Sequence, residues 1–347
     1  MEPIRWGVLS TASIARLVIG ANRGSEATRF VAVASRDEAR AERFAAELGL
    51  EASFGSYQAL LASDLVDAVY VALPVSMHTD WTLRALEAGK HVLCEKPFAT
   101  GPADAARCVD AAEAAGRVVV EGFMWRHHPQ TALARRLLAE GAIGRLSTIR
   151  AALSVAVPPG DIRRSPALGG GALGDLGCYC VSAARLFGGH PTRVWAERVL
   201  DAATGPDGGV DLRLAATMRL PDQVLALFDV GLDLTRRDEL ELVGTGGRLI
   251  TPDPWLCRAG AVVLETGGRT ERLPADPDGA RGLTGEEADA YRIEFDVVSA
   301  VMAAGDPPGF GRADVVDQAA VLEAVGRSAA TGLPVEPPPS AAEPGSS

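Results

Sequence analysis

The sequence lacks any apolar stretch of the roughly 18 residues that a membrane-spanning helix needs. Its first residues, Met1-Glu2-Pro3, do not follow the charged-then-apolar pattern of a signal peptide. Its five cysteines form no CxxC pair and are odd in number, which is typical of reduced thiols and not of a disulfide framework or a zinc site. We therefore expect a cytoplasmic protein that binds neither a membrane nor a metal.

The sequence also has fewer basic than acidic residues. The chain has 34 Lys and Arg against 45 Asp and Glu, and the resulting net charge of -11 repels nucleic acid and anionic lipid, so we expect neither as a partner. Apolar residues make up 47% of the 347 residues and charged residues 23%, as in ordinary globular proteins. At roughly 150 residues per domain, the length predicts two domains.

Lysine is especially rare, because only Lys90 and Lys96 stand among the 34 Lys and Arg residues. Where arginine is the default cation, a retained lysine indicates chemistry that a fixed, bulky guanidinium cannot perform. Lys96 follows a predicted buried strand and lies at its carboxyl end, where open parallel sheets bind ligands. Lys96 is therefore a candidate catalytic residue, and a solvated cation at the end of the strand is the alternative.

Short apolar runs alternate with amphipathic stretches from residue 4 to residue 120. The pattern predicts strands over 4–9, 30–34, 68–73, 91–94 and 118–120, and helices over 38–48, 79–88 and 103–115. This alternation is typical of repeated right-handed βαβ units around a parallel sheet. It predicts a first, α/β domain over residues 1–122.

The pattern changes after residue 123. One helix is predicted over 129–140, followed by longer alternating segments over 148–157, 210–219 and 224–232, which are typical of antiparallel strands with one exposed face. A run of glycines at 169–171 leads into a predicted helix over 172–186. We expect a second domain over 123–330 and a proline-rich, mobile tail over 331–347.

The turn after the first strand has the spacing of a GxGxxG dinucleotide-binding turn, although small residues replace its three glycines. Ser10-Thr11-Ala12-Ser13-Ile14-Ala15 follows the strand directly. Such a turn needs a backbone that offers its N–H groups to a pyrophosphate and a helix that starts without bulk. It indicates a dinucleotide site, with an ordinary strand-to-helix turn as the alternative.

The end of the second strand bears on the choice of cofactor. An NAD enzyme usually places an acidic residue there, whereas this chain has Ser35 followed by Arg36. A hydroxyl and a guanidinium suit a 2′-phosphate, which a carboxylate would repel. We therefore expect NADP(H) in preference to NAD(H). Asp37 argues for NAD(H) unless it caps the following helix, which is the interpretation that we favour.

Asp175 and Tyr179 lie four residues apart, on one face of the predicted helix and about one turn from each other. Tyrosine has an ordinary pKa of about 10, so it accepts a proton near neutral pH only where a cation stabilises the phenolate. Lys96 is a cation that could do so. The alternative for Tyr179 is a half-buried aromatic residue of the core.

Four segments carry a resemblance to a known family, namely GVLSTASIA (7–15), AGKHVLCEKP (88–97), EGFMWRHHPQ (121–130) and GGGALGDLGCYCV (169–181). Over nearly its whole length the sequence resembles the Gfo/Idh/MocA oxidoreductases, especially the branch of NADP-dependent dihydrodiol and D-xylose dehydrogenases. The resemblance implies an α/β fold with an N-terminal Rossmann domain, a doubly wound parallel sheet. It also implies a C-terminal α+β domain with an open-faced, mostly antiparallel sheet, across which a dimer often forms.

The same resemblance assigns roles to residues. It implies that Lys96 is the catalytic lysine, Tyr179 the acid/base residue and Asp175 its supporting carboxylate, with a cis peptide bond before Pro97. Val75 departs from the family, in which many members have an asparagine beside the cofactor.

Motifs and resemblance together predict which residues bind the cofactor and the substrate. The cofactor-binding residues are Gly7, Ser10, Thr11, Ala12, Ser13, Ile14, Ser35, Arg36, Leu73, Pro74, His78, Glu95 and Lys96. The substrate side is predicted to include Trp125, Arg126 and His127, for each of which a structural role at the domain junction is the alternative. For His78 the alternative is a surface group at the start of a helix.

The expected function is reversible hydride transfer between NADP(H) and a carbinol or carbonyl carbon of a sugar, cyclic polyol or diol. Tyr179 would exchange the proton and Lys96 would assist it. One alternative keeps the enzyme class and makes the substrate a nucleotide-linked keto sugar, reduced at its 3-keto group. A second alternative is an NADP-binding sensor protein without catalysis, which would not need Lys96, Asp175 and Tyr179 together.

Overall fold

The computed structural model describes residues 2–202, 209–276 and 289–341, and it divides into two compact units. The first unit comprises Met1–Phe123 and Tyr291–Val315, and the second comprises Met124–Ala290 and Val316–Ser347. The division after Phe123 lies next to the predicted boundary at residue 122. The return of 291–315 to the first unit differs from the prediction, which left these residues in the second domain.

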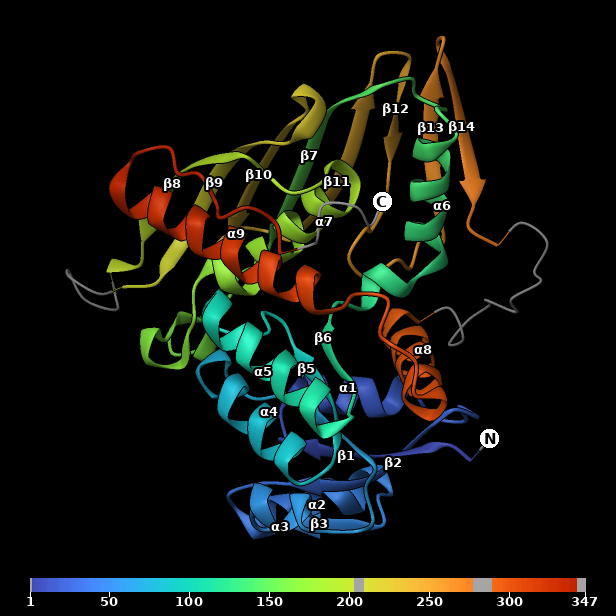
Figure 1. Ribbon diagram of the computed structural model, residues 1–347, viewed down its shortest axis with the longest axis vertical. Helices are drawn as coiled ribbons and strands as arrows, with labels where there is room; N and C mark the ends of the chain where they lie inside the picture. The colour runs from blue at the N-terminus through green and yellow to red at the C-terminus, as the bar shows by residue number, and fades with distance from the viewer. Residues whose placement is uncertain (1, 203–208, 277–288, 342–347) are drawn as a thin grey trace. The chain divides into compact units, whose positions relative to one another are not determined.

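The first unit is built on sheet A, whose six strands are all parallel and run in the order β3-β2-β1-β4-β5-β6 (Figure 1). This is the strand order of a doubly wound Rossmann sheet, which confirms the predicted fold class. The strands are β1 (Ile4–Leu9), β2 (Thr28–Ala34), β3 (Ala52–Phe54), β4 (Ala68–Val71), β5 (His91–Glu95) and β6 (Val119–Gly122). The sequence pattern misses β3, which has only three residues and no fully buried side chain.

Helices connect the strands of sheet A, and local signals set their ends. They are α1 (Ser13–Ala21), α2 (Glu38–Leu48), α3 (Tyr57–Leu61), α4 (His78–Glu87) and α5 (Pro102–Ala115). Helix α2 begins after Asp37, whose side chain caps it, and ends at Gly49 in the left-handed conformation, with a φ of 72°. Gly116 ends α5 in the same way, with a φ of 61°.

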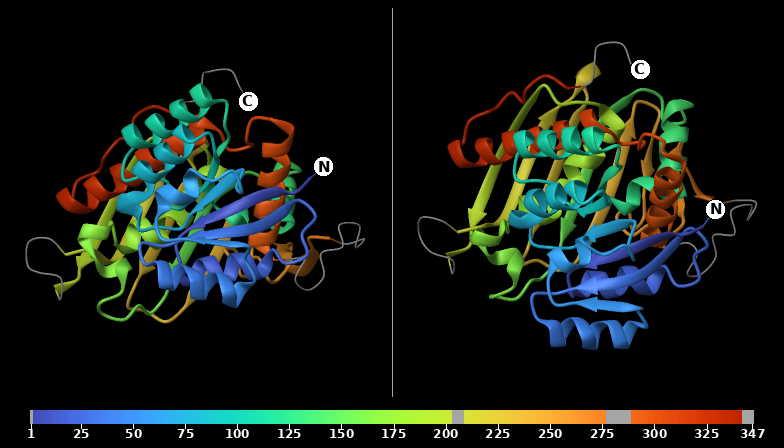
Figure 2. Two further views of the ribbon diagram at one scale, coloured as in Figure 1. Left: turned by 90° about the horizontal axis from the view of Figure 1, so that it is seen from below. Right: turned by 60° about the horizontal axis from the view of Figure 1, so that its bottom comes forward.

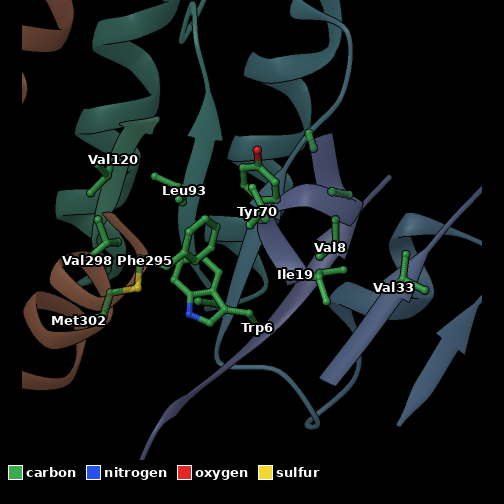
Figure 3. Packing of buried hydrophobic residues seen from close by; sticks show 14 of the residues in the cluster. Trp6, Val8, Ile19, Val33, Tyr70, Leu93, Val120, Phe295, Val298 and Met302 are labelled. Atoms are coloured by element: carbon green, nitrogen blue, oxygen red, sulfur yellow. The ribbon is translucent and has the colours of Figure 1, made fainter. Parts of the chain in front are cut away.

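Helix α8 (Ala290–Ala304) completes the core of the first unit (Figure 3). Phe295 and Trp6 of β1 are both fully buried, and their rings pack edge to face with centroids 4.8 Å apart. The indole N–H of Trp6 donates a hydrogen bond to Ser299 Oγ over 3.0 Å. The segment 291–315 returns to this unit because an aromatic side chain of β1 would otherwise be left uncovered.

The second unit is built on sheet B, whose eight described strands run in the order β14-β13-β12-β11-β7-β10-β9-β8. Only the pair β7 and β10 is parallel, which confirms the predicted mostly antiparallel sheet. The strands are β7 (Leu146–Ser154), β8 (Arg193–Leu200), β9 (Asp211–Arg219), β10 (Leu225–Gly231), β11 (Arg237–Gly244), β12 (Gly247–Ile250), β13 (Ala261–Thr266) and β14 (Arg269–Pro274).

Helices cover one face of sheet B, and the other face is open. Helices α7 (Cys178–Gly188) and α9 (Arg312–Thr331) lie over the covered face, and α6 (Pro129–Ala139) runs beside β13 (Figures 1 and 2). Buried and exposed residues alternate along β9, as expected for a sheet covered on one face. Trp195, Leu225 and Leu227 are exposed on the open face. No helix among the described residues is long and apolar enough to span a membrane.

Residues 331–341 differ from the mobile tail that the sequence predicts for 331–347. Val335 pairs with Val194 of β8, and two backbone hydrogen bonds of 2.8 Å join them. Further along, the backbone N–H of Ala341 donates to Asp317 Oδ1 over 2.8 Å. The prolines remove some donors from this segment but leave the N–H and C=O of Val335 free to pair. Residues 342–347 lie outside the described part of the chain.

Candidate active site

The first half of the candidate site lies at one edge of sheet A. Because the strands are parallel, the turns that follow β1, β2, β4 and β5 all leave the sheet at its carboxyl edge. Most of the residues predicted to bind the cofactor lie in these turns. Lys96 lies in this first unit and Asp175 and Tyr179 in the second, so their cooperation belongs to the proposal below.

The turn after β1 leaves the start of α1 without a side-chain cap. Ser10 Oγ accepts a hydrogen bond from the N–H of Ala12 over 2.9 Å and so holds the turn. Ala12 itself occupies the N-cap position and has no polar side chain, and Ser13 and Ile14 follow it in the first turn of the helix. Uncapped N–H groups at a helix start suit a phosphate, so these residues fit a pyrophosphate.

Gly7 lies within β1, where the lack of a side chain serves packing, and its contact with the cofactor stays a prediction. It is buried inside the strand, and a Cβ at this position would come within 2.8 Å of Leu60 Cδ2 and 3.0 Å of Val66 Cγ1. The missing side chain therefore makes room for the apolar side chains packed against the strand.

The turn after β2 presents Arg36 to solvent, whereas Ser35 is buried. Asp37 Oδ1 accepts a hydrogen bond from the N–H of Arg40 over 3.0 Å, which confirms the interpretation of Asp37 as the N-cap of α2. Ser35 Oγ accepts from the N–H of Asp37 over 3.2 Å. The one carboxylate in this turn is thus occupied by the helix, and the guanidinium is exposed.

Two carboxylates hold the turn that carries Lys96. The Lys96–Pro97 peptide bond is cis, as the resemblance predicted. Glu95 Oε2 accepts a hydrogen bond from the N–H of Lys96 over 3.2 Å, and Glu121 Oε1 of β6 accepts from the N–H of Phe98 over 3.0 Å. The hydroxyl of Tyr70 on β4 donates to the other oxygen of Glu95. Lys96 therefore stands on a turn that is fixed on both sides.

His78 ties the same turn to the turn after β4. Its Nδ1 lies 2.9 Å from the carbonyl oxygen of Pro97 and its Nε2 lies 2.8 Å from that of Leu73. The side chain is almost fully buried, and this burial, helped by the charge of Lys96, lowers the pKa of His78. Both ring nitrogens contact the backbone and the side chain is buried, so the alternative of a surface group is wrong. The contact of His78 with a cofactor stays a prediction.

The predicted helix over 172–186 contains an irregularity at its start. Residues Leu173–Gly177 form a π-helical turn, and the α-helix α7 begins only at Cys178. Asp175 therefore lies in a π-helical turn, while Tyr179 lies in the first turn of α7. Such turns occur frequently at functional sites, because they change the direction in which side chains leave a helix.

Tyr179 lies in an aromatic environment within the second unit. Its side chain is 7% exposed, and its ring centroid lies 5.6 Å from that of Trp255. Its hydroxyl donates to Met124 Sδ over 3.7 Å, a weak contact. Trp125, predicted on the substrate side, is fully buried and packs edge to face against Trp255 with centroids 5.6 Å apart.

The other two residues predicted on the substrate side lie in the same short helix, Met124–His127. Arg126 is buried and donates through Nε to Ser182 Oγ of α7 over 2.8 Å. Burial and the adjacent Arg126 lower the pKa of His127 to about 4, which keeps this imidazole neutral near pH 7. Arg126 therefore contributes to packing around α7.

The glycine run before Asp175 has a steric reason. A Cβ on Gly170 would lie 2.4 Å from the carbonyl oxygen of Arg163, and the N–H of Gly171 donates to that oxygen over 2.9 Å. The side chain of Arg163 makes a bidentate ion pair with Asp161. This pair and the nearby negative charge of Asp175 raise the pKa of Arg163. The glycines thus bring an arginine close to Asp175.

Glu121, Tyr70 and Arg163 are missed by the sequence analysis. Glu121 and Tyr70 lie in strands, and their contacts with the Lys96 turn depend on the order of strands in the sheet. Glu121 lies near the end of β6, which pairs with β5, and this position could have indicated its contact with the Lys96 turn. Arg163 lies in the short 3-10 helix Ile162–Arg164, and no signal in the sequence links it to Asp175.

All five cysteines are buried and none forms a disulfide. Burial raises the pKa of four of them, Cys94, Cys108, Cys180 and Cys257, which are therefore unreactive thiols of the core. The described residues include no group of three or more His, Cys, Asp or Glu side chains that could hold a metal.

Comparisons with known proteins identify the family. Residues 4–123 match the model of an oxidoreductase family with an NAD-binding Rossmann fold, and residues 131–250 match that of the GFO/IDH/MocA C-terminal domain. The chain is 37% identical over 339 residues to D-xylose 1-dehydrogenase (NADP(+)) 2 of Haloferax volcanii, an alignment that covers 95% of this chain and 99% of that protein. The chain belongs to the Gfo/Idh/MocA oxidoreductase family.

Other relatives of this Gfo/Idh/MocA protein act on nucleotide-linked sugars. It is 36% identical over 343 residues to dTDP-3,4-didehydro-2,6-dideoxy-alpha-D-glucose 3-reductase of Saccharopolyspora spinosa, with coverage of 95% of this chain and 99% of that protein. Its fold matches the crystal structure of a 3-ketoreductase from Actinomadura kijaniata in complex with NADP and TDP-benzene, with a TM-score of 0.83 and 34% identity. That match covers 94% of this chain and 98% of the other.

Proposed function

We propose that the protein is an NADP-dependent oxidoreductase that transfers a hydride between the nicotinamide and a carbinol or carbonyl carbon of a sugar. The similarity to a D-xylose 1-dehydrogenase along nearly the full length of both chains supports this substrate class. The single observation that carries the proposal is the fixed turn at the carboxyl end of β5, where Glu95, Glu121 and His78 hold the backbone on both sides of the lysine.

The preference for NADP(H) rests on the turn after β2. Asp37 caps α2, so its carboxylate is engaged where an NAD enzyme would use one for the ribose hydroxyls. Arg36 is exposed beside it and offers a planar set of donors to a 2′-phosphate. We propose that the pyrophosphate binds at the start of α1. The remaining contacts come from residues in or next to the turns after β1, β4 and β5, namely Ser10, Thr11, Ala12, Ser13, Ile14, Leu73, Pro74 and Glu95.

In the proposed mechanism, NADP(H) supplies the site that accepts or donates the hydride. Lys96 and Tyr179 act on the same substrate oxygen. During oxidation of a carbinol, Tyr179 accepts the hydroxyl proton, and during reduction it returns that proton to the carbonyl oxygen. The ammonium of Lys96 binds this oxygen and favours the phenolate form of Tyr179. Asp175 orients the pair, and the aromatic rings around Tyr179 restrict water.

A panel assay tests the proposed function. The purified chain is supplied with free aldoses, cyclic diols and dTDP-keto sugars, with NADP(H) and NAD(H) in parallel, and absorbance at the nicotinamide band is followed. We expect turnover of at least one sugar with NADP(H), and a Lys96→Met variant should lose most of it. Binding of NADPH without turnover of any substrate in the panel would contradict the proposal and favour the sensor alternative.

A nucleotide-linked keto sugar is a second candidate substrate, because the similarity to 3-reductases of dTDP sugars also extends along nearly the full length of both chains. Solved structures of the Actinomadura 3-ketoreductase include a tyrosine-to-phenylalanine variant and lysine-to-alanine and lysine-to-glutamate variants. The two candidates differ in the panel: a dTDP-keto sugar should be reduced with NADPH far faster than any free aldose is oxidised with NADP if the second one holds.

A further inference from the structure

A carboxylate from β9 caps the helix segment that carries Asp175 and Tyr179. Asp211 Oδ2 accepts a hydrogen bond from the backbone N–H of Leu173 over 2.6 Å. Leu173 is the first residue of the π-helical turn, and Ala172, which occupies the N-cap position before it, has no polar side chain. The strand therefore supplies the acceptor that the helix lacks at its own N-cap.

The same carboxylate fills the space that Gly171 leaves. A Cβ on Gly171 would lie 2.3 Å from Asp211 Oδ1, and the φ of this glycine is 133°, a conformation that L side chains rarely adopt. The carbonyl oxygen of Gly171 accepts from the N–H of Asp175 over 3.0 Å. The Asp211 carboxylate thus accepts from the first N–H of the turn, that of Leu173. The carbonyl of Gly171 binds the N–H of Asp175 within the same turn.

Burial at this position disfavours the ionised form of the Asp211 carboxylate. Burial raises the pKa of Asp211 to about 6, and the N–H groups of Leu173 and Ala172 together with the charge of Arg198 on β8 only partly oppose this effect. Other charged groups on β9 and on neighbouring elements include Arg213, which pairs with Asp233, Asp229 of β10, which pairs with Arg237, and Glu197 of β8. The loop before the glycine run adds the ion pairs Arg163–Asp161 and Arg164–Asp201. An ionised carboxylate accepts stronger hydrogen bonds than an amide, which offsets part of the cost of burial.

We propose that Asp211 is a positioning residue: its carboxylate fixes the π-helical turn Leu173–Gly177 and thereby the directions of Asp175 and Tyr179. Without this acceptor the turn can relax toward the α-helical register. A shift of one residue rotates the following side chains by about 100° relative to Asp175. The effect on turnover rests on the proposed function, whereas the effect on the turn itself rests on the contacts of Asp211 alone.

Amide hydrogen exchange tests the anchoring without any need for turnover. The full chain is compared with its Asp211→Asn and Asp211→Ala variants, and Asp233→Asn is the matched control, because Asp233 pairs with Arg213 of the same strand. We expect exchange of the amides of 173–177 to become about tenfold faster in Asp211→Ala and to increase less in Asp211→Asn, which retains one acceptor oxygen. The control should exchange like the original chain.

Steady-state kinetics test the consequence for the reaction. We expect kcat of Asp211→Asn to fall about tenfold, while KM for the sugar and Kd for NADPH stay within about twofold. In the original chain kcat should rise as the pH rises through about 6, where Asp211 ionises, and this step should be missing in the Asn variant. A structural defect alone would lower the amount of active protein and would leave the pH profile unchanged.

The results separate the two proposals. Unchanged amide exchange at 173–177 in a folded Asp211→Asn protein would overturn the positioning role, and so would an unchanged kcat and pH profile. If Asp211→Ala does not fold, the Asn variant alone decides. If the original chain turns over no substrate in the panel, the proposed function fails, and the exchange measurement still decides whether Asp211 anchors the turn.

Discussion

The side chain of Asp37 accepts a hydrogen bond from the backbone N–H of Arg40 over 3.0 Å, and this contact ties the one carboxylate after β2 to the helix that follows. Arg36, directly before it, is exposed. The choice between the two nicotinamide cofactors therefore depends on which of these neighbours faces the adenosine ribose. The proposed function assigns that role to the guanidinium.

Replacing Arg36 should affect NADP more than NAD. A hydrogen bond between charged groups contributes about 1.5–3 kcal/mol, so Arg36→Ala should weaken NADP binding by about 10- to 100-fold and leave NAD binding nearly unchanged. The matched control is Arg29→Ala, because Arg29 is an exposed arginine that pairs with Glu51. Titration of both cofactors by fluorescence measures the ratio. Equal losses for NADP and NAD would reject the contact with the phosphate.

Replacing Asp37 should lower stability and leave cofactor choice alone. Loss of an N-cap costs about 1 kcal/mol, so Asp37→Ala should unfold at a lower denaturant concentration by a corresponding amount. Asp37→Ser retains a capping oxygen and should recover most of this loss. If instead Asp37→Ala lost NAD binding specifically, the carboxylate would belong to the cofactor site and not to the helix.

Gly170 should not tolerate a side chain. A Cβ would lie 2.4 Å from the carbonyl oxygen of Arg163, so Gly170→Ala forces the backbone apart and should cost about 1–3 kcal/mol of the free energy of unfolding. In the matched control Gly326→Ala the nearest atom, a methyl carbon of Leu173, lies at 3.6 Å, and the substitution sits within α9. The control should be neutral or slightly stabilising. Equal effects of both substitutions in chemical denaturation would refute the steric explanation.

His127 should make the protein less stable in mild acid. Its pKa is lowered to about 4 in the folded state from an ordinary value of 6.5, so below pH 6.5 the unfolded chain takes up a proton that the folded chain refuses. This contribution to stability is complete above pH 6.5 and is lost as the pH falls toward 4, by at most about 1.4 kcal/mol per pH unit.

The measurement is the difference in free energy of unfolding between the original chain and His127→Phe, followed from pH 7.5 to pH 4.5. The subtraction removes the opposite contribution of Asp211, whose raised pKa adds stability below its ordinary value of 3.8 and loses it as the pH rises through about 6. The original chain should lose more stability on acidification than the variant. Parallel curves would mean that His127 titrates normally in the folded protein.

The first half of the fold could be predicted from the sequence because its signals are local. Buried strands separated by amphipathic helices follow from apolar periodicity, and Asp37 and Gly49 mark the two ends of α2 within a few residues of chain. The candidate residues Lys96, Asp175 and Tyr179 came from position and from the resemblance. What α8 covers could not be predicted in the same way, since Phe295 meets Trp6 only after the chain has folded.

The contacts that support the candidate site could not be predicted either, because they join residues that meet only in the folded chain. His78 sits between the carbonyl groups of Leu73 and Pro97, and the apolar pattern of α4 says nothing about which way an imidazole points. Asp211 lies 38 residues from Leu173, and its carboxylate reaches the helix only because β9 begins beside it. The π-helical turn could not be predicted from the apolar pattern, because that pattern was interpreted with the period of a regular α-helix.

Hydride transfer by a Tyr179→Phe variant tests the central claim most directly. The rate is measured in a single turnover with saturating NADP and the best substrate of the panel, beside Tyr57→Phe as a control and with Kd for NADPH determined separately. The account predicts that loss of the acid/base hydroxyl slows the step by about 100- to 10,000-fold while NADPH binds as before. A Tyr179→Phe protein that reacts at the rate of the original chain would contradict it.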